Sequence, residues 1–259
     1  MFYSAGERQA LALPFSSGSV FGRFLGLSRQ DAVGRRDGYS LSFVVIVAVF
    51  VTCLITANIT AVKLIGIFGL VFDAGTLIFP ISYIFGDVLT EVYGYRVARR
   101  VIWLGFLCNL LAVAVIVAAS LLPAAPDFEA QAAYERILGY APRLLLASFL
   151  AYLVGEFANG FVLAKLKVAT NGRWLWSRTI SSTLVGQSLD SLVFVVIAFS
   201  GVIPASAMVA VILTQVLLKS AYEALATPLT YLIVNRLKRT EGVDAYDRDT
   251  NFNPLLISR

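Results

Sequence analysis

The stretch LSFVVIVAVFVTCLITANITAV, residues 41–62, is a continuous apolar run that contains no charged side chain. A helix that crosses the hydrocarbon core of a bilayer needs about 20 predominantly apolar residues, and this run supplies them. Five further segments are long and apolar enough to span, at 69–93, 97–121, 143–164, 180–201 and 205–235. The sequence therefore predicts an all-α membrane protein with six transmembrane helices.

The composition of the whole chain supports this class. Of the 259 residues, 58% are hydrophobic and only 14% are charged, and the mean hydropathy is +0.79. An ordinary soluble domain has about 25% charged residues. A soluble fold could not cover so much apolar surface, so lipid is the solvent for most of the chain.

Residue types that are missing or isolated exclude several kinds of chemistry. The chain has no histidine, which excludes a Ser-His-Asp relay and a HExxH zinc site. Cys53 and Cys108 lie far apart inside apolar runs, without metal-ligand spacing, and there is no P-loop motif. We therefore expect no enzyme activity, no metal and no cofactor. Transport driven by ATP would need a separate ATPase subunit.

Basic residues gather in short blocks between the apolar segments. The blocks precede the first segment and follow the second, fourth and sixth, whereas the loop at 122–142 is richer in acids. Positively charged loops stay in the cytoplasm, so this alternation predicts an even number of spans with both termini cytoplasmic. Five or seven spans would break the alternation. The same spacing argues against nucleic-acid binding, although the net charge is +5.

The apolar segments divide the chain into three regions. Residues 1–40 lack a signal-peptide pattern and are predicted to be a flexible cytoplasmic extension, with a transit peptide as the alternative. Residues 41–235 form the predicted six-helix transmembrane domain. Residues 236–259 form a polar tail that we expect in the cytoplasm.

Ionisable and amide side chains occur inside the predicted spans, where a charge that faces lipid costs about 2.5–3.5 kcal/mol at the bilayer centre. They recur at helical spacing, so each helix carries one polar stripe. The stripes comprise Tyr83, Asp87 and Glu91 on the second span, Glu156 and Asn159 on the fourth, Gln187, Asp190 and Phe194 on the fifth, and Lys219 and Glu223 on the sixth, with Asn58 on the first as a further wall. We predict that the stripes line a polar cavity. The alternative is a set of structural hydrogen bonds between helices.

The charge of this predicted cavity is unbalanced, because five acids face a single base, Lys219. Some carboxyls must therefore be protonated, paired with a bound cation, or satisfied by a ligand rich in N–H donors. Lys219 is expected to pair across the bundle, for instance with Glu156 or Asp190. Pro80 stands two turns before Asp87 and marks either a tolerated kink or a break that exposes backbone groups to cargo.

Five motifs, in a fixed order along the chain, are similar to those of a known protein family. They are NITAVK (58–63), PISYIFGDVLTEVYGYRVARR (80–100), GEFANGFVLAKLK (155–167), RTISSTLVGQSLDSLVFVVIAF (178–199) and KSAYEALATPL (219–229), followed by TNFNP in the tail. Together they resemble the YhhQ-type queuosine precursor transporters, a family also described as vitamin uptake transporters. The resemblance covers residues 41–235.

This resemblance implies a bacterial inner-membrane protein whose six-helix fold is similar to the substrate-binding subunits of energy-coupling-factor importers, acting without a dedicated ATPase. It implies as cargo a 7-deazaguanine, such as preQ0, preQ1 or queuine, salvaged for tRNA modification. The family motifs map onto the stripe residues other than Tyr83 and Phe194, which are candidates to sandwich a flat ring. The alternative is an importer of the same fold for another small heterocycle or vitamin, with or without coupling to a separate ATPase module. The oligomeric state is not indicated.

Overall fold

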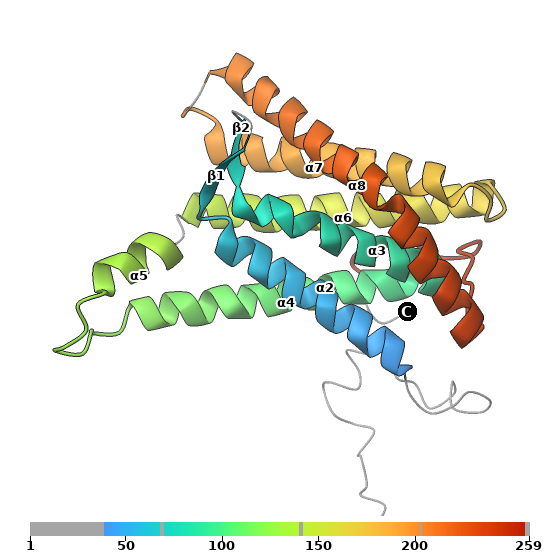
Figure 1. The fold of residues 1–259 in the computed structure, drawn as a ribbon, viewed down its shortest axis with the longest axis horizontal. Coiled ribbons are helices and arrows are strands. Elements are labelled where there is room, and N and C mark those ends of the chain that lie inside the picture. The colour runs from blue at the N-terminus through green and yellow to red at the C-terminus, as the bar shows by residue number, and fades with distance from the viewer. Residues whose placement is uncertain (1–38, 68–69, 140–141, 203, 257–259) are drawn as a thin grey trace, which may run out of the picture. The chain divides into compact units, whose positions relative to one another are not determined.

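The computed structural model describes residues 39–67, 70–139, 142–202 and 204–256 (Figure 1). Within these ranges, Gly38–Pro254 forms one compact unit, which contains all the helices and strands given below. The predicted N-terminal extension, residues 1–40, lies almost entirely outside the described residues. Ser40 is described, and its side chain accepts a hydrogen bond from the backbone N–H of Phe43 to cap the first helix.

Helices make up most of the described chain. They are α2 (Leu41–Thr60), α3 (Phe79–Tyr93), α4 (Tyr95–Ser120), α5 (Gln131–Leu138), α6 (Pro142–Ala169), α7 (Leu175–Phe199) and α8 (Ala205–Glu241). By length and composition, five segments within the described ranges could cross a membrane: α2, α4, α5 and α6 taken together, α7 and α8. The protein is therefore a multi-pass, mainly α-helical membrane protein, and α8 continues beyond the predicted end of the last span at 235.

The predicted second span, 69–93, is only partly helical, so the prediction of one continuous helix there is wrong. Strands β1 (Leu64–Ile67) and β2 (Leu70–Asp73) form an antiparallel hairpin, and a 3-10 helix (Ala74–Leu77) leads into α3. Three glycines, at positions 66, 69 and 75, disfavour a helix through this stretch. The 15 residues of α3 extend over about 22 Å, less than the roughly 30 Å of hydrocarbon.

Pro80 initiates α3 instead of kinking a longer helix. It lies in the first turn of α3, where the N–H that proline lacks would have had no partner within the helix. Of the two alternatives for Pro80, a kink within a longer helix is therefore not found in the described backbone. The helical backbone is instead interrupted before Pro80, by the hairpin and the 3-10 helix.

Helix α3 occupies the middle of the unit. It packs against α2, α4, α6 and α8, while α6 and α7 form the most extensive helix pair and α7 also packs against α8. Figure 1 shows that the end of α3, the start of α4, the end of α6, the start of α7 and the end of α8 lie at the same end of the unit. These are the ends that carry the basic blocks at 96–100, 165–178 and 236–239.

Two glycines allow α6 and α7 to approach closely. A Cβ added at Gly155 would stand 2.8 Å from Asp190 Cβ, and one added at Gly186 would stand 2.8 Å from Asn159 Cβ. Small residues at helix crossings are typical of membrane helices, whose association depends on close packing. The close contact buries the polar side chains that flank these glycines.

The distribution of side chains suits a lipid environment. Large apolar side chains are exposed along the outer faces, for example Leu111 and Val115 on α4 and Leu217 and Leu225 on α8. Acids, amides and hydroxyls are buried between α3, α6, α7 and α8. A surface this apolar around a polar interior is stable only when hydrocarbon is the solvent.

Candidate functional site

Polar side chains from four helices meet in the interior and form what we term the central cluster. Its members are Tyr83 and Asp87 from α3, Glu156 and Asn159 from α6, Gln187 and Asp190 from α7, and Lys219 and Glu223 from α8. Every member is at most 5% exposed except Lys219, whose side chain is 10% exposed. The predicted convergence of four polar stripes is therefore present in the structure.

Direct contacts tie the four helices together through this cluster. Asn159 Nδ2 donates a hydrogen bond to Asp87 Oδ1 at 2.7 Å, which joins α6 to α3. Lys219 Nζ pairs with Asp190 Oδ2 at 3.0 Å, which joins α8 to α7. The expectation that Lys219 pairs across the bundle is confirmed, with Asp190 as the partner.

Glycines make room for two more members of the cluster. A Cβ at Gly86 would lie 3.0 Å from Glu156 Oε2, so the Glu156 carboxyl rests against the backbone of α3. A Cβ at Gly155 would lie 2.8 Å from the hydroxyl oxygen of Tyr83, so that hydroxyl reaches the backbone of α6. Both glycines are thus needed for the polar groups of facing helices to meet.

Hydrogen-bond acceptors dominate the central cluster, and many have no partner. Within the described residues, no hydrogen bond reaches the oxygens Asp87 Oδ2, Glu156 Oε1 and Oε2, Asn159 Oδ1, Gln187 Oε1, and Glu223 Oε1 and Oε2. Leaving a buried polar group unpaired costs about 1–3 kcal/mol, and more for a charged one. The cluster is therefore suited to a ligand that supplies several N–H or O–H donors.

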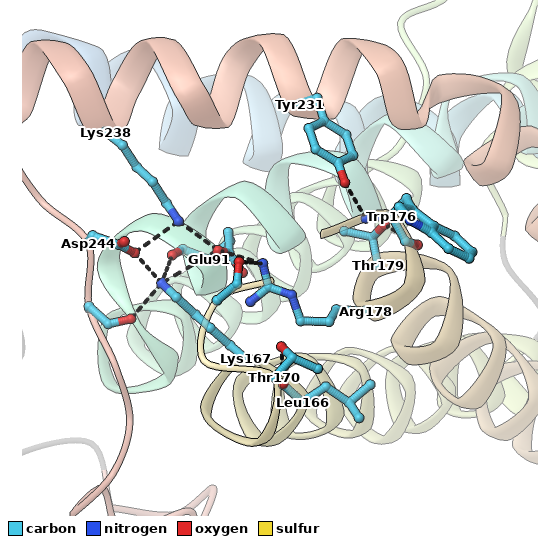
Figure 2. Close-up of polar contacts among 12 residues, drawn as sticks. Glu91, Leu166, Lys167, Thr170, Trp176, Arg178, Thr179, Tyr231, Lys238 and Asp244 are labelled. Atoms are coloured by element: carbon cyan, nitrogen blue, oxygen red, sulfur yellow. Dashed lines mark hydrogen bonds and ion pairs between the residues drawn. The ribbon is translucent and has the colours of Figure 1, made fainter. Parts of the chain in front are cut away.

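Glu91 lies one turn beyond Asp87 on α3 but belongs to a different group of side chains, which we term the tail cluster (Figure 2). Its Oε1 is contacted by Lys238 Nζ at 2.7 Å, Arg178 Nη2 at 3.1 Å and Lys167 Nζ at 3.5 Å. Lys167 and Lys238 also pair with Asp244. The structure thus surrounds Glu91 with basic side chains and separates it from the other predicted binding residues.

The tail cluster fastens the C-terminal segment, residues 243–254, to the ends of the helices. Lys167 Nζ donates to the backbone oxygens of Glu91 and Ala245, and the Ala245 N–H donates to Val92 O at 3.1 Å. Partial burial alone would raise the pKa of Asp244, but hydrogen bonds from Lys167 and Lys238 outweigh it and hold the pKa below its ordinary value.

Further along, the same segment reaches α4. Asp247 Oδ2 accepts a hydrogen bond from the Tyr95 N–H at 2.9 Å, in the first turn of α4. Arg99 Nη1 donates to the backbone oxygens of Asn251 and Asn253, at 2.9 and 2.7 Å. The polar composition of the tail gave no sign of this docking. The signals available in the sequence were the TNFNP motif and two basic residues, Arg99 and Lys167, which donate to carbonyls of this segment.

Two predicted site residues have their described contacts elsewhere. The half-buried ring of Phe194 packs edge to face on Phe199, with ring centroids 6.1 Å apart. Asn58 Oδ1 accepts a hydrogen bond from Ser148 Oγ at 3.3 Å, which ties α2 to α6. The Phe194 contact lies within α7 and the Asn58 contact joins two helices, and neither contact places its residue in the central cluster.

Sequence reasoning missed two hydroxyl groups on α7. Thr183 and Ser191 are buried on the face that carries Gln187 and Asp190, and neither hydroxyl oxygen has a hydrogen-bond partner in the part of the chain that the structure describes. Their positions four residues before Gln187 and four residues after it extend the same stripe. The spacing could have revealed them, but serine and threonine are common enough in membrane helices to pass unnoticed.

A multi-pass helical protein with a buried polar cluster of this kind has the architecture of a membrane transporter. Over residues 73–233 the chain matches the model of the family described as "Putative vitamin uptake transporter", and it belongs to that family. It is therefore a member of a transporter family and not an enzyme.

Three relatives with assigned names are similar to this chain in sequence. The chain is 33% identical over 180 residues to a protein of Bacillus subtilis (strain 168) named "Probable queuosine precursor transporter", a match that covers 68% of this chain and 78% of that one. It is 30% identical over 125 residues to the queuosine precursor transporter of Escherichia coli (strain K12), which covers 48% and 54% of the two chains. A Haemophilus influenzae relative with the same name as the Bacillus protein is 29% identical over 145 residues, which covers 56% of this chain and 59% of the relative. No solved structure matches the chain.

Proposed function

We propose that this protein imports queuosine precursors, 7-deazaguanines such as preQ0 and preQ1 or the base queuine, for the salvage of queuosine in tRNA. The observation that carries the proposal is the set of buried acceptors without partners in the central cluster. The names of the relatives point to the same cargo. The family description also admits another small heterocycle or vitamin, which the experiment below includes as an alternative.

The chemistry of the cargo complements the cluster. A guanine-like ring presents N1–H and an exocyclic amino group side by side, and one carboxylate can accept both hydrogen bonds. Asp87 suits this task because Asn159 holds its Oδ1 while no described residue donates to its Oδ2. The ammonium of Lys219 and the amide of Gln187 are the donors available for the ring carbonyl. Tyr83, buried among these groups, is the aromatic side chain that we propose for stacking.

The arrangement of the helices supports a specific topology. We infer that α3 is the short central span of a six-helix domain over residues 41–235, similar to the substrate-binding subunits of energy-coupling-factor importers. The support is that α3 packs against four other helices and carries both Asp87 and Glu91. The basic blocks gather at one end, so that end is proposed to face the cytoplasm, with both termini, in a bacterial inner membrane.

A salvage assay tests the proposed function. In cells that cannot synthesise the precursor, expression of the chain should restore queuosine in tRNA at low external preQ0, preQ1 or queuine, and D87N should abolish the restoration. The matched control is D249N, because Asp249 is exposed in the C-terminal segment. If the wild-type protein is inserted in the membrane and restores nothing, the proposal fails. Direct uptake of another labelled heterocycle or vitamin by the same cells would then identify the alternative cargo.

A further inference from the structure

Two glutamates of the central cluster stand out because neither carboxyl group has a hydrogen-bond partner among the described residues. Glu156 on α6 and Glu223 on α8 are each 1% exposed, and no described residue donates to any of their four carboxyl oxygens. The two carboxyls are close enough for their charges to interact, and both also interact with Asp87 on α3. A carboxylate in such surroundings has lost its hydration without receiving compensation.

The other charged and titratable groups around this pair do not neutralise it. Asp190 on α7 faces Glu156 but is already paired with Lys219. Glu91, the next acid on α3, is matched by the basic side chains of the tail cluster. The remaining neighbours are the phenols of Tyr83 and Tyr152, which are neutral at physiological pH.

Three carboxyls, Asp87, Glu156 and Glu223, are therefore left without a cation from the described residues. Acids this close together in a desolvated site cannot all be ionised. A proton satisfies such a group with one carboxyl oxygen, whereas a metal ion needs several oxygen ligands. Across the described ranges, no three acidic side chains are arranged to hold a metal ion. The chain also has no histidine to carry a proton instead.

We propose that Glu156 and Glu223 form a proton-binding site and that the proton bound there is the coupling ion of uptake. The inference rests on the proposed function, because it gives that transport cycle its source of energy. The site loads from the side of higher proton activity and releases its proton when it opens to the cytoplasm. Glu156 Oε2 rests against Gly86, so movement of α3 relative to α6 changes the surroundings of this carboxyl directly.

Reconstituted transport tests the coupling. The full chain in proteoliposomes, with labelled preQ1 as the probe, should accumulate substrate when the outside is more acidic than the lumen. One proton per substrate gives about tenfold accumulation at equilibrium for each pH unit, and a protonophore should abolish it. In E156Q and E223Q the ratio of uptake with and without the gradient should fall to one. The matched control is E135Q, an exposed glutamate of α5.

The bound proton can also be detected directly, so that the test does not depend on variants that transport poorly. In the purified wild-type protein, the infrared C=O band of a protonated carboxyl should be present at neutral pH, and it should weaken in E156Q or E223Q. Accumulation that ignores the pH gradient or follows a sodium gradient would overturn the inference, as would an absent band. Absence of all uptake of preQ0, preQ1 and queuine, including counterflow without a gradient, would instead refute the proposed function, and the infrared band would still test the proton site.

Discussion

Asp87 and Glu91 lie one helical turn apart on α3 and have opposite surroundings. Asp87 meets acids and one amide, while Glu91 meets two lysines and an arginine. Helical spacing predicted both residues on one polar stripe and could not separate their roles. The difference arises from Arg178 and Lys238, which are 87 and 147 positions away in the sequence. Membership of a polar stripe could be predicted from sequence, and so could the pairing of Lys219 with an acid on another helix, but the partners of Glu91 could not.

The substitution E91Q tests the structural role of this carboxylate. It would leave Arg178 without its acidic partner among the described residues, and Lys167 and Lys238 with Asp244 alone. Removing one partner of a buried ion pair costs about 3–5 kcal/mol. We expect a clear fall in the thermal unfolding temperature of the detergent-purified protein. E135Q, at an exposed position, should not change it. Unchanged stability together with lost binding of preQ1 would return Glu91 to the substrate site.

Asp244 predicts how stability depends on pH. The pKa of this carboxyl is lower in the folded protein than in the unfolded chain, because Lys167 and Lys238 donate hydrogen bonds to it. Its contribution to stability is therefore complete when the pH is above the pKa of aspartate in the unfolded chain, about 3.9. That contribution is lost as the pH falls through the pKa of Asp244 in the folded protein. The variant D244N should be less stable at neutral pH and should lose less stability on acidification. The measurement is the unfolding temperature of the wild type and of D244N as a function of pH, from neutral to acidic. Parallel curves for the two proteins would contradict the prediction.

At the scale of elements, a span was predictable where a single helix fills the apolar run. The predicted segments 41–62 and 180–201 correspond to α2 at Leu41–Thr60 and α7 at Leu175–Phe199. The segment 69–93 failed because hydropathy does not distinguish an apolar hairpin from an apolar helix. Glycine content was the available signal, and the backbone follows it: the helix starts only at Phe79.

The crossing of α6 and α7 offers a test at the same scale. In G155A or G186A the new methyl group would fall about 2.8 Å from a neighbouring side chain, and overpacking of this kind typically costs about 1–3 kcal/mol. We expect a smaller yield of detergent-stable protein and reduced uptake. G66A is the matched control, because a Cβ there would meet nothing within 4 Å. If G155A and G186A behave like G66A, the helices are not held by this contact.

For the whole molecule, the gathering of basic side chains at one end was predictable, because the positive-inside rule depends only on which loops carry lysine and arginine. The contacts that these basic side chains make inside the protein could not be predicted. Lys167, Arg178 and Arg99 are each about 1% exposed, and they neutralise Glu91 or hold the C-terminal segment. A charge count over loops treats such residues as solvated, whereas here they act as internal links between distant parts of the chain.

The orientation can be tested by labelling single cysteines. Cys53 and Cys108 are first replaced by alanine, and a cysteine is then placed at exposed Asp249 or at exposed Glu129 in the loop before α5. A membrane-impermeant maleimide added to intact cells should label the Glu129 site and leave the Asp249 site unlabelled until the cells are opened. The reverse pattern would invert the topology, and labelling of both sites in intact cells would mean an even number of spans between them, in place of the three helices α6, α7 and α8.

Docking of the C-terminal segment also sets the order of events during biosynthesis. Tyr95 and Asp247, which meet at the start of α4, are separated by 152 positions. At 5–20 residues per second, a ribosome needs roughly 8–30 s to travel from the first to the second. During that interval α3 is complete and α4 is finished early, while the residues that complete their junction do not yet exist. Assembly of this junction can therefore finish only after α6, α7 and α8 and the segment that follows them have been synthesised.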